Sequence, residues 1–312
     1  MTSYLESGSR ASRALVDPRA RAATFEEARD LCFALTRAEG ENFSVISWLA
    51  PRAMREPLAA VYAFCRTVDN LGDEDWAVAG RAGDRIALLD EFEGELDRAY
   101  TGAPRHPIFV ALRPTIERFG LPRELFARLI EANRMDQHAK RYATFADLLR
   151  YCEHSATPVG RLVLALYGRG GDEECALSDA TCIGLQLANF WQDVKRDYAI
   201  GRVYLPQNEM AEYGVRDEDL AAATASESLR RLLRFQVERT RDYFARGLPL
   251  LDRVSGHLRV DLALFSRGGL AILDKIERQG YDTLGRRPTV GKIEKAKILF
   301  STLLTRRWDR WA

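Results

Sequence analysis

Hydrophobic residues recur with helical spacing along nearly the whole chain, from residue 24 to residue 310. Three such faces are formed by Phe25, Ala28, Leu31, Cys32 and Leu35, by Leu58, Val61, Phe64, Val68 and Leu71, and by Phe126, Leu129 and Ile130. Strand-like alternation is scarce, and glycines and prolines fall between the periodic stretches, as they do at helix ends. The 312 residues therefore predict about ten helices in a single all-α domain. We expect residues 24–312 to form this domain and residues 1–23 to form a mobile tail.

Charge and cysteine content exclude several classes of protein. The formal net charge is +1, without the basic surplus that nucleic-acid binding proteins usually carry, so we expect no nucleic-acid partner. The five cysteines are odd in number and contain no C-x-x-C pair, which indicates neither a disulfide framework nor a zinc site. We interpret them as small buried apolar residues of a protein in a reducing compartment.

Apolar runs are too short to predict a membrane-spanning helix, and the N-terminal stretch lacks the apolar core of a signal peptide. We therefore expect a cytoplasmic protein. The closing segment, Ile293 to Trp311, is amphipathic and basic, with Trp308 and Trp311 near its end. The favoured interpretation is a helix packed on the core, and the alternative is a peripheral contact with the inner face of a membrane.

Oxygen-bearing side chains recur every four residues in two separate helical stretches. The first contains Asp69 and Asp73, and the second contains Asn189, Asp193 and Asp197. Four residues turn a helix by about 400° and advance it by about 6 Å, so each set lines one stripe. Apolar residues cover much of the remaining circumference of both stretches, which is typical of buried helices.

The setting of these stripes decides between two interpretations. On a solvated helix, carboxylates four residues apart repel by only about 0.2–0.5 kcal/mol, and we interpret Glu91, Glu93, Glu95 and Asp97 as such a face. In a half-buried site, charges about 6 Å apart repel by roughly 3 kcal/mol at an effective dielectric constant near 20. Cations would then be needed to offset this repulsion. Mg²⁺ suits such a site, because it takes oxygen ligands and also bridges to phosphate oxygens. We expect the two stripes to face each other across an apolar cavity.

Two arginines lie where they could bind an anion beside these acids. Arg66 precedes Asp69 by three residues, and Arg202 follows Gly201 in a short loop after the second stripe. A guanidinium in such a loop can bind phosphate oxygens in a bidentate manner. Arg66 could equally form a simple ion pair on its own helix. The four histidines, His106, His138, His154 and His257, lack metal-ligand spacing, and we interpret them as structural.

At this point several motifs resemble the squalene/phytoene synthase family. They are the segment from Val61 to Glu74, the segment from Gln186 to Asp197, the loop from Gly201 to Pro206, and the segment from Tyr151 to Gly160. The resemblance covers about residues 25–305, with the motifs in the family's order.

The resemblance implies an all-α isoprenoid-synthase bundle around a central cavity, and it implies a role for each matching residue. Magnesium would be held by Asp69, Asp73, Asn189, Asp193 and Asp197. The substrate's diphosphate would contact Arg66 and Arg202, and Tyr62 and Tyr151 would lie near the reacting carbons. The prenyl tails would run along apolar side chains such as Phe43, Val159 and Leu187.

Two departures from the family pattern narrow the expected substrate. Glu41 and Asn42 precede Phe43 where many members have Ser or Arg, and Gln192 stands where many have an arginine before the aspartate. Both departures remove donors from the diphosphate region, so we expect a substrate with one diphosphate and count Gln192 among its contacts. These residues resemble those of the family members that convert presqualene diphosphate to hydroxysqualene in bacterial hopanoid biosynthesis. There magnesium assists diphosphate loss, the cation rearranges and water captures it.

Three alternatives remain open at the level of sequence. The chain could couple two farnesyl diphosphates to presqualene diphosphate or squalene, or it could be a phytoene synthase. It could also be a non-catalytic helical protein that binds a prenyl lipid, although intact ligand stripes argue against this. We expect a prenyl diphosphate as its partner, and neighbouring hopanoid-pathway enzymes are the further partners that this interpretation suggests.

Overall fold

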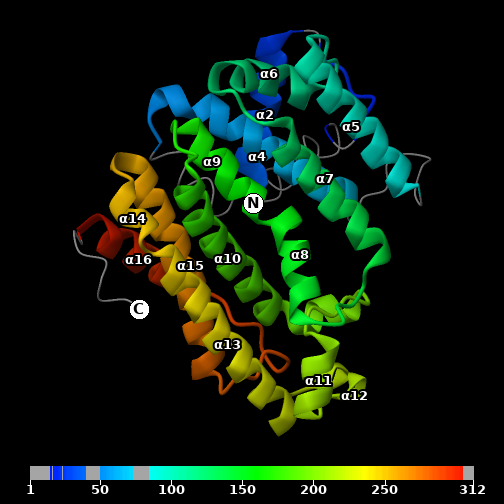
Figure 1. Ribbon diagram of the computed structural model, residues 1–312, viewed down its shortest axis with the longest axis vertical. Coiled ribbons are helices and arrows are strands. Elements are labelled where there is room, and N and C mark those ends of the chain that lie inside the picture. The colour runs from blue at the N-terminus through cyan, green and yellow to red at the C-terminus, as the bar shows by residue number, and fades with distance from the viewer. Residues whose placement is uncertain (1–14, 16, 23, 40–49, 73–83, 305–312) are drawn as a thin grey trace. The chain divides into compact units, whose positions relative to one another are not determined.

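The computed structural model describes residues 15, 17–22, 24–39, 50–72 and 84–304. Over this part of the chain the regular structure is helical, apart from an isolated parallel bridge between Arg141 and Val203 (Figure 1). The all-α expectation is confirmed, with 77% of the described residues in helices. The chain divides into two compact units, and we describe each by itself. That residues 24–312 act as a single domain stays a prediction.

Unit 1 comprises residues 1–138 and 161–170. Its helices are α2 (Phe25–Glu39), α4 (Arg52–Gly72), α5 (Arg85–Thr101), α6 (Pro107–Phe119) and α7 (Arg123–His138). Phe64 of α4 lies at the centre, with ring centroids 5.6 Å from Phe92, 5.8 Å from Phe109 and 4.9 Å from Phe126. Four helices thus meet around one aromatic cluster, which fixes the orientation of α4.

Unit 2 comprises residues 139–160 and 171–312. Its helices are α8 (Phe145–Ser155), α10 (Asp172–Ala199), α11 (Gln207–Tyr213), α12 (Asp217–Ala221), α13 (Glu227–Gly247), α14 (Leu250–Arg253), α15 (Gly256–Arg278) and α16 (Lys292–Leu304). Helix α9 (Thr157–Leu166) begins in this unit and ends in unit 1. The long helix α10 packs against both α13 and α15 (Figure 1).

Glycines allow α10 and α13 to approach closely. A Cβ at Gly247 would lie 2.1 Å from Oγ1 of Thr181, and one at Gly184 would lie 3.3 Å from the ring of Phe244. Farther along, fully buried Trp191 donates its indole N–H to Oγ1 of Thr240 at 2.8 Å. These contacts bury one face of α10 along most of its length.

The solvated acidic face expected on α5 is wrong at Glu95. It is buried, and it accepts hydrogen bonds from the backbone N–H groups of Arg105 (2.8 Å) and His106 (2.9 Å). Arg98 pairs with it at 2.5 Å. The sequence pattern missed this because the donors come from a loop that lies ten residues farther along the chain.

His106 links the start of α6 to the N-terminal stretch. Its Nδ1 accepts the N–H of Ile108, which leaves Nε2 protonated to donate to the carbonyl of Leu15, 3.0 Å away. Leu15 is itself fully buried, so at this point the stretch predicted as a mobile tail belongs to the packed interior of unit 1. The other residues expected to form that tail are described only in part.

Burial lowers the pKa of His106 from 6.5 to about 4. Between these values the unfolded chain binds a proton that the folded chain does not, so stability falls as the pH falls, by at most about 1.4 kcal/mol per unit. His106→Asn keeps a capping acceptor but cannot titrate. We expect wild type to be the more stable near pH 7 and its advantage to shrink towards about pH 4.5. Urea unfolding across this range measures the gap, and a gap independent of pH would contradict the assignment.

Candidate active site

Helix α4 carries the described part of the first stripe. Tyr62 and Arg66 are half-buried and Asp69 is exposed, all on one side of the helix. Asp73 and Phe43 lie outside the described residues, as do Glu41 and Asn42. The expected roles of these last four residues stay predictions.

Two amides of α7 that the sequence did not single out fix the end of α4. Asn133 reaches Oδ1 of Asp69 at 3.5 Å, and Gln137 donates to the carbonyl of Gly72 at 3.1 Å. A Cβ at Gly72 would lie 2.1 Å from Oδ1 of Asn133, so only glycine allows this approach. The end of α4 that presents Asp69 is therefore positioned by direct packing on α7.

Helix α10 carries the second stripe on the face opposite its contact with α13. Asp193 lies about 200° round the helix from Trp191, and Asn189 and Asp197 lie one turn to either side of it. Asn189 is exposed, whereas Asp193 and Asp197 are half-buried. The structure thus brings these three predicted ligands together on one stripe.

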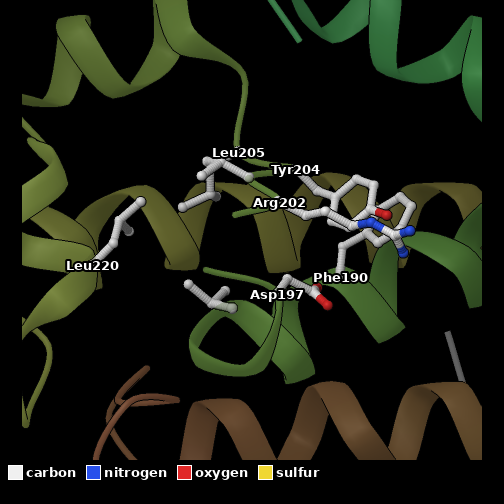
Figure 2. Close-up of a pocket in the computed structure, with 8 residues that line it drawn as sticks. Phe190, Asp197, Arg202, Tyr204, Leu205 and Leu220 are labelled. Carbon is white, nitrogen blue, oxygen red and sulfur yellow. The ribbon is translucent and has the colours of Figure 1, made fainter. Parts of the chain in front are cut away.

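The turn after α10 places Arg202 beside this stripe. Gly201 adopts φ +78°, and the backbone N–H of Arg202 donates to the carbonyl of Asp197 at 2.8 Å, which closes the helix end. Figure 2 shows Asp197, Arg202 and Tyr204 with their polar ends on the same side, away from Leu205 and Leu220. The turn thus brings Arg202 next to Asp197, and its expected contact with the diphosphate stays a prediction.

A narrow cavity lies against these residues (Figure 2). Its lining consists of Phe190, Val194, Asp197, Arg202, Val203, Tyr204, Leu205 and Leu220. Traced by the centre of a water molecule, its volume is about 10 Å³, which is room for one water and not for a prenyl chain. It is therefore a small niche beside Asp197 and Arg202.

Tyr151 joins an aromatic cluster on α10. Its ring centroid lies 6.2 Å from Phe190 and 5.9 Å from Tyr204, and Tyr204 stacks on Phe190 at 3.9 Å. Tyr142 completes the cluster, 5.5 Å from Tyr151. The cluster therefore packs Tyr151 against Phe190, the residue that directly follows Asn189 in α10.

The segment from Leu284 to Pro288 lies along α10 and was not anticipated. Arg287 pairs with Asp193 through both carboxylate oxygens, at 2.5 and 2.8 Å. Gln192 donates its side-chain amide to the carbonyl of Pro288 at 2.5 Å. Gln192 therefore has a structural contact, and its expected contact with substrate stays a prediction.

The donors on α10 suit a hard divalent cation. They are two carboxylates and an amide. The ion pair of Asp193 with the Arg287 guanidinium shows that this carboxylate attracts positive charge. Within the described ranges, no cluster of three or more His, Cys, Asp and Glu side chains could hold a metal by itself. That Asp69 and Asp73 contribute to the same metal site stays a prediction.

The structure shows where the remaining predicted residues lie. Their expected roles stay predictions. Leu187 is fully buried and Val159 half-buried, as tunnel-lining residues can be. Cys32 and Cys152 are buried, and the other three cysteines are half-buried. Burial raises the pKa of the Cys32 thiol to about 12, which fits the interpretation of Cys32 as a small buried apolar residue.

The fold and the site together define a class of protein. Its described residues fold into helices, and its solved structural neighbours have helical isoprenoid-synthase folds. The sequence profile described as "Squalene/phytoene synthase" matches residues 36–294, and the chain belongs to this family. Members of the family act on prenyl diphosphates, so the protein is an enzyme of isoprenoid biosynthesis.

Individual relatives agree with this assignment. The chain is 36% identical to the phytoene synthase of Thermus thermophilus, covering 87% of this chain and 91% of the relative. It is 33% identical to the 15-cis-phytoene synthase of Synechococcus elongatus, over 86% and 90%. Among solved structures, squalene synthase HpnC from Alicyclobacillus acidocaldarius is 46% identical with a TM-score of 0.77, covering 82% and 95%. A dehydrosqualene synthase, 23% identical with a TM-score of 0.81 over 89% and 96%, shares the fold.

One buried carboxyl lies outside both stripes. Asp261 of α15 is almost fully buried, and its Oδ1 has no hydrogen-bond partner among the described residues. Burial raises its pKa from 3.8 to about 7.

Asp261→Asn should stabilise the protein near pH 8. Because the pKa is raised in the folded state, ionisation of Asp261 lowers the free energy of unfolding. This loss is absent below about pH 4 and complete above about pH 7. We expect a gain of about 1–3 kcal/mol near pH 8 that disappears towards pH 4. Chemical denaturation at both ends of this range measures it. A variant that loses stability at high pH would mean that the carboxylate has a favourable partner.

Proposed function

We propose that the protein converts presqualene diphosphate to hydroxysqualene in a magnesium-dependent reaction. Gln192 carries this proposal, because it replaces a cationic donor of many family members and its amide is engaged by Pro288. One positive charge fewer beside the stripe suits one diphosphate better than two. The unusual Glu41–Asn42 pair argues in the same direction.

In the proposed reaction the chain's residues bind and orient the leaving group. Asp69, Asp73, Asn189, Asp193 and Asp197 would hold Mg²⁺, which when bound supplies Lewis-acid stabilisation of the diphosphate. Arg66 and Arg202 would stabilise the negative charge that develops as the carbon–oxygen bond breaks.

The site must also stabilise the carbocation that remains after the diphosphate leaves. Tyr62 and Tyr151 would present their rings and hydroxyls near it while the cyclopropylcarbinyl cation rearranges. Apolar side chains, Val159 and Leu187 among them, would exclude bulk water until that rearrangement is complete. Water then forms the carbon–oxygen bond of the alcohol and releases one proton.

A second candidate function is head-to-head coupling of two prenyl diphosphates. The 46% identity to a protein named squalene synthase and the phytoene synthase relatives favour it. It requires two diphosphates in the site at once, so the two candidates differ in which substrate is consumed.

A product assay separates these functions. With Mg²⁺, we expect presqualene diphosphate to yield hydroxysqualene and farnesyl diphosphate to be consumed slowly or not at all. Asp193→Asn and Asp69→Asn should each lower the rate on the order of 100-fold or more, because each removes a ligand. Glu212→Gln, an exposed acid on α11, should have no effect. Rapid coupling of farnesyl diphosphate alone would refute the proposed substrate.

We also propose a peripheral contact with an anionic membrane through α16. Within the described residues no helix is long and apolar enough to cross a membrane. Helix α16, however, has Ile293, Phe300 and Leu304 on one face, 74%, 70% and 73% exposed. Lys292 and Lys297 flank that face, as in helices that lie on anionic lipid. Its other face is held on α15 by the Lys275–Glu294 pair (2.6 Å) and by Arg267, which donates to Thr302.

Vesicle sedimentation tests this contact. Phe300→Ser combined with Leu304→Ser should reduce binding to vesicles that contain anionic lipid, with activity on detergent-dispersed substrate unchanged. Phe235→Ser, on the exposed side of α13, is the matched control. Equal binding by the double variant and wild type would exclude α16 as the contact. Trp308 and Trp311 lie outside the described residues, and association with neighbouring pathway enzymes stays a prediction.

A further inference from the structure

Arg287 places a permanent positive charge on a proposed metal ligand. Its Nε lies 2.5 Å from Oδ1 of Asp193 and its Nη2 lies 2.8 Å from Oδ2, a bidentate arrangement. The Asp193 side chain is 19% exposed and that of Arg287 is 40% exposed. The hydrogen bonds to Asp193 raise the pKa of Arg287, and the charge of Asp197 adds to this effect. By contrast, Arg196 approaches Asp193 only to 3.8 Å and is 71% exposed.

The backbone on either side of Arg287 is anchored independently of this ion pair. Gln192 holds the carbonyl of Pro288 at 2.5 Å, and Lys195 holds the carbonyl of Leu284 at 3.0 Å. Both anchors come from α10 itself. The guanidinium can therefore leave Asp193 by side-chain rotation while the segment stays on α10.

We propose that Arg287 is an internal cation that competes with Mg²⁺ for the carboxylate of Asp193, so that Mg²⁺ binding depends on the diphosphate. This inference rests on the metal role proposed for Asp193. A Mg²⁺ ion demands near-octahedral oxygen ligands at about 2.0–2.1 Å, which the bidentate guanidinium obstructs. An ion that arrives alone must break two charge-assisted hydrogen bonds and meets a like charge. An ion that arrives with a diphosphate brings negative charge that offsets this repulsion. Arg287 is thus a positioning residue that favours binding of the metal together with the substrate.

Calorimetric titration of Mg²⁺ into the full-length protein tests the proposal. Without inorganic pyrophosphate, Arg287→Gln should bind Mg²⁺ about tenfold or more tightly than wild type, because the competing charge is gone. With pyrophosphate present, this difference should shrink. Arg287→Lys keeps the charge without the bidentate geometry and should be intermediate. Arg286→Gln, which alters the exposed neighbouring arginine, should bind as wild type does.

Two outcomes would overturn the proposal, and they are distinguishable. If Asp193→Asn loses Mg²⁺ binding but Arg287→Gln binds no more tightly than wild type, the competition is refuted and the metal role of Asp193 stands. If Asp193→Asn binds Mg²⁺ as wild type does, the metal role itself fails and the competition with it. Thermal unfolding of each variant confirms that it is folded, and a purely structural ion pair would change the unfolding temperature without tightening Mg²⁺ binding.

Discussion

The close contact between α10 and α13 determines where the chemistry of unit 2 can occur. Gly184 and Gly247 let the helices approach, and the hydrogen bond from Trp191 to Thr240 fixes their rotation. Because this contact occupies one face of α10, oxygen donors spaced every four residues are left on the opposite face. Rotation of α10 by even one residue, about 100°, would remove Asp193 from that position.

Charge balance around the C-terminal half of α10 follows from this placement. Asp193 and Asp197 lie one turn apart in a half-buried setting, where their repulsion is costly. The structure supplies positive charge from two loops, with Arg287 on Asp193 and Arg202 in the turn that follows Asp197. Under the proposed function the same arginines would also attract the anionic diphosphate. Folding stability and the proposed diphosphate binding would then both require positive charge beside this helix.

Local features of this protein could be predicted from the sequence, and distant pairings could not. Helical periodicity identified the helices, and the four-residue spacing placed Asn189, Asp193 and Asp197 on one stripe. Gly201 correctly indicated a turn that brings Arg202 back to Asp197. Arg287 was missed because 94 residues separate it from Asp193, and no periodic pattern connects them. Glu95 was wrongly assigned to a solvated face for the same reason, since its donors lie in another segment.

A crystal structure with Mn²⁺ and inorganic pyrophosphate tests the central claim, that the face of α10 opposite α13 is a divalent-cation site. Mn²⁺ substitutes for Mg²⁺ at oxygen ligands and is located by its anomalous scattering. We predict an anomalous peak within about 2.2 Å of a carboxylate oxygen of Asp193, with the Arg287 guanidinium displaced from that carboxylate. Mn²⁺ bound elsewhere, with the Arg287–Asp193 pair intact, would contradict the account.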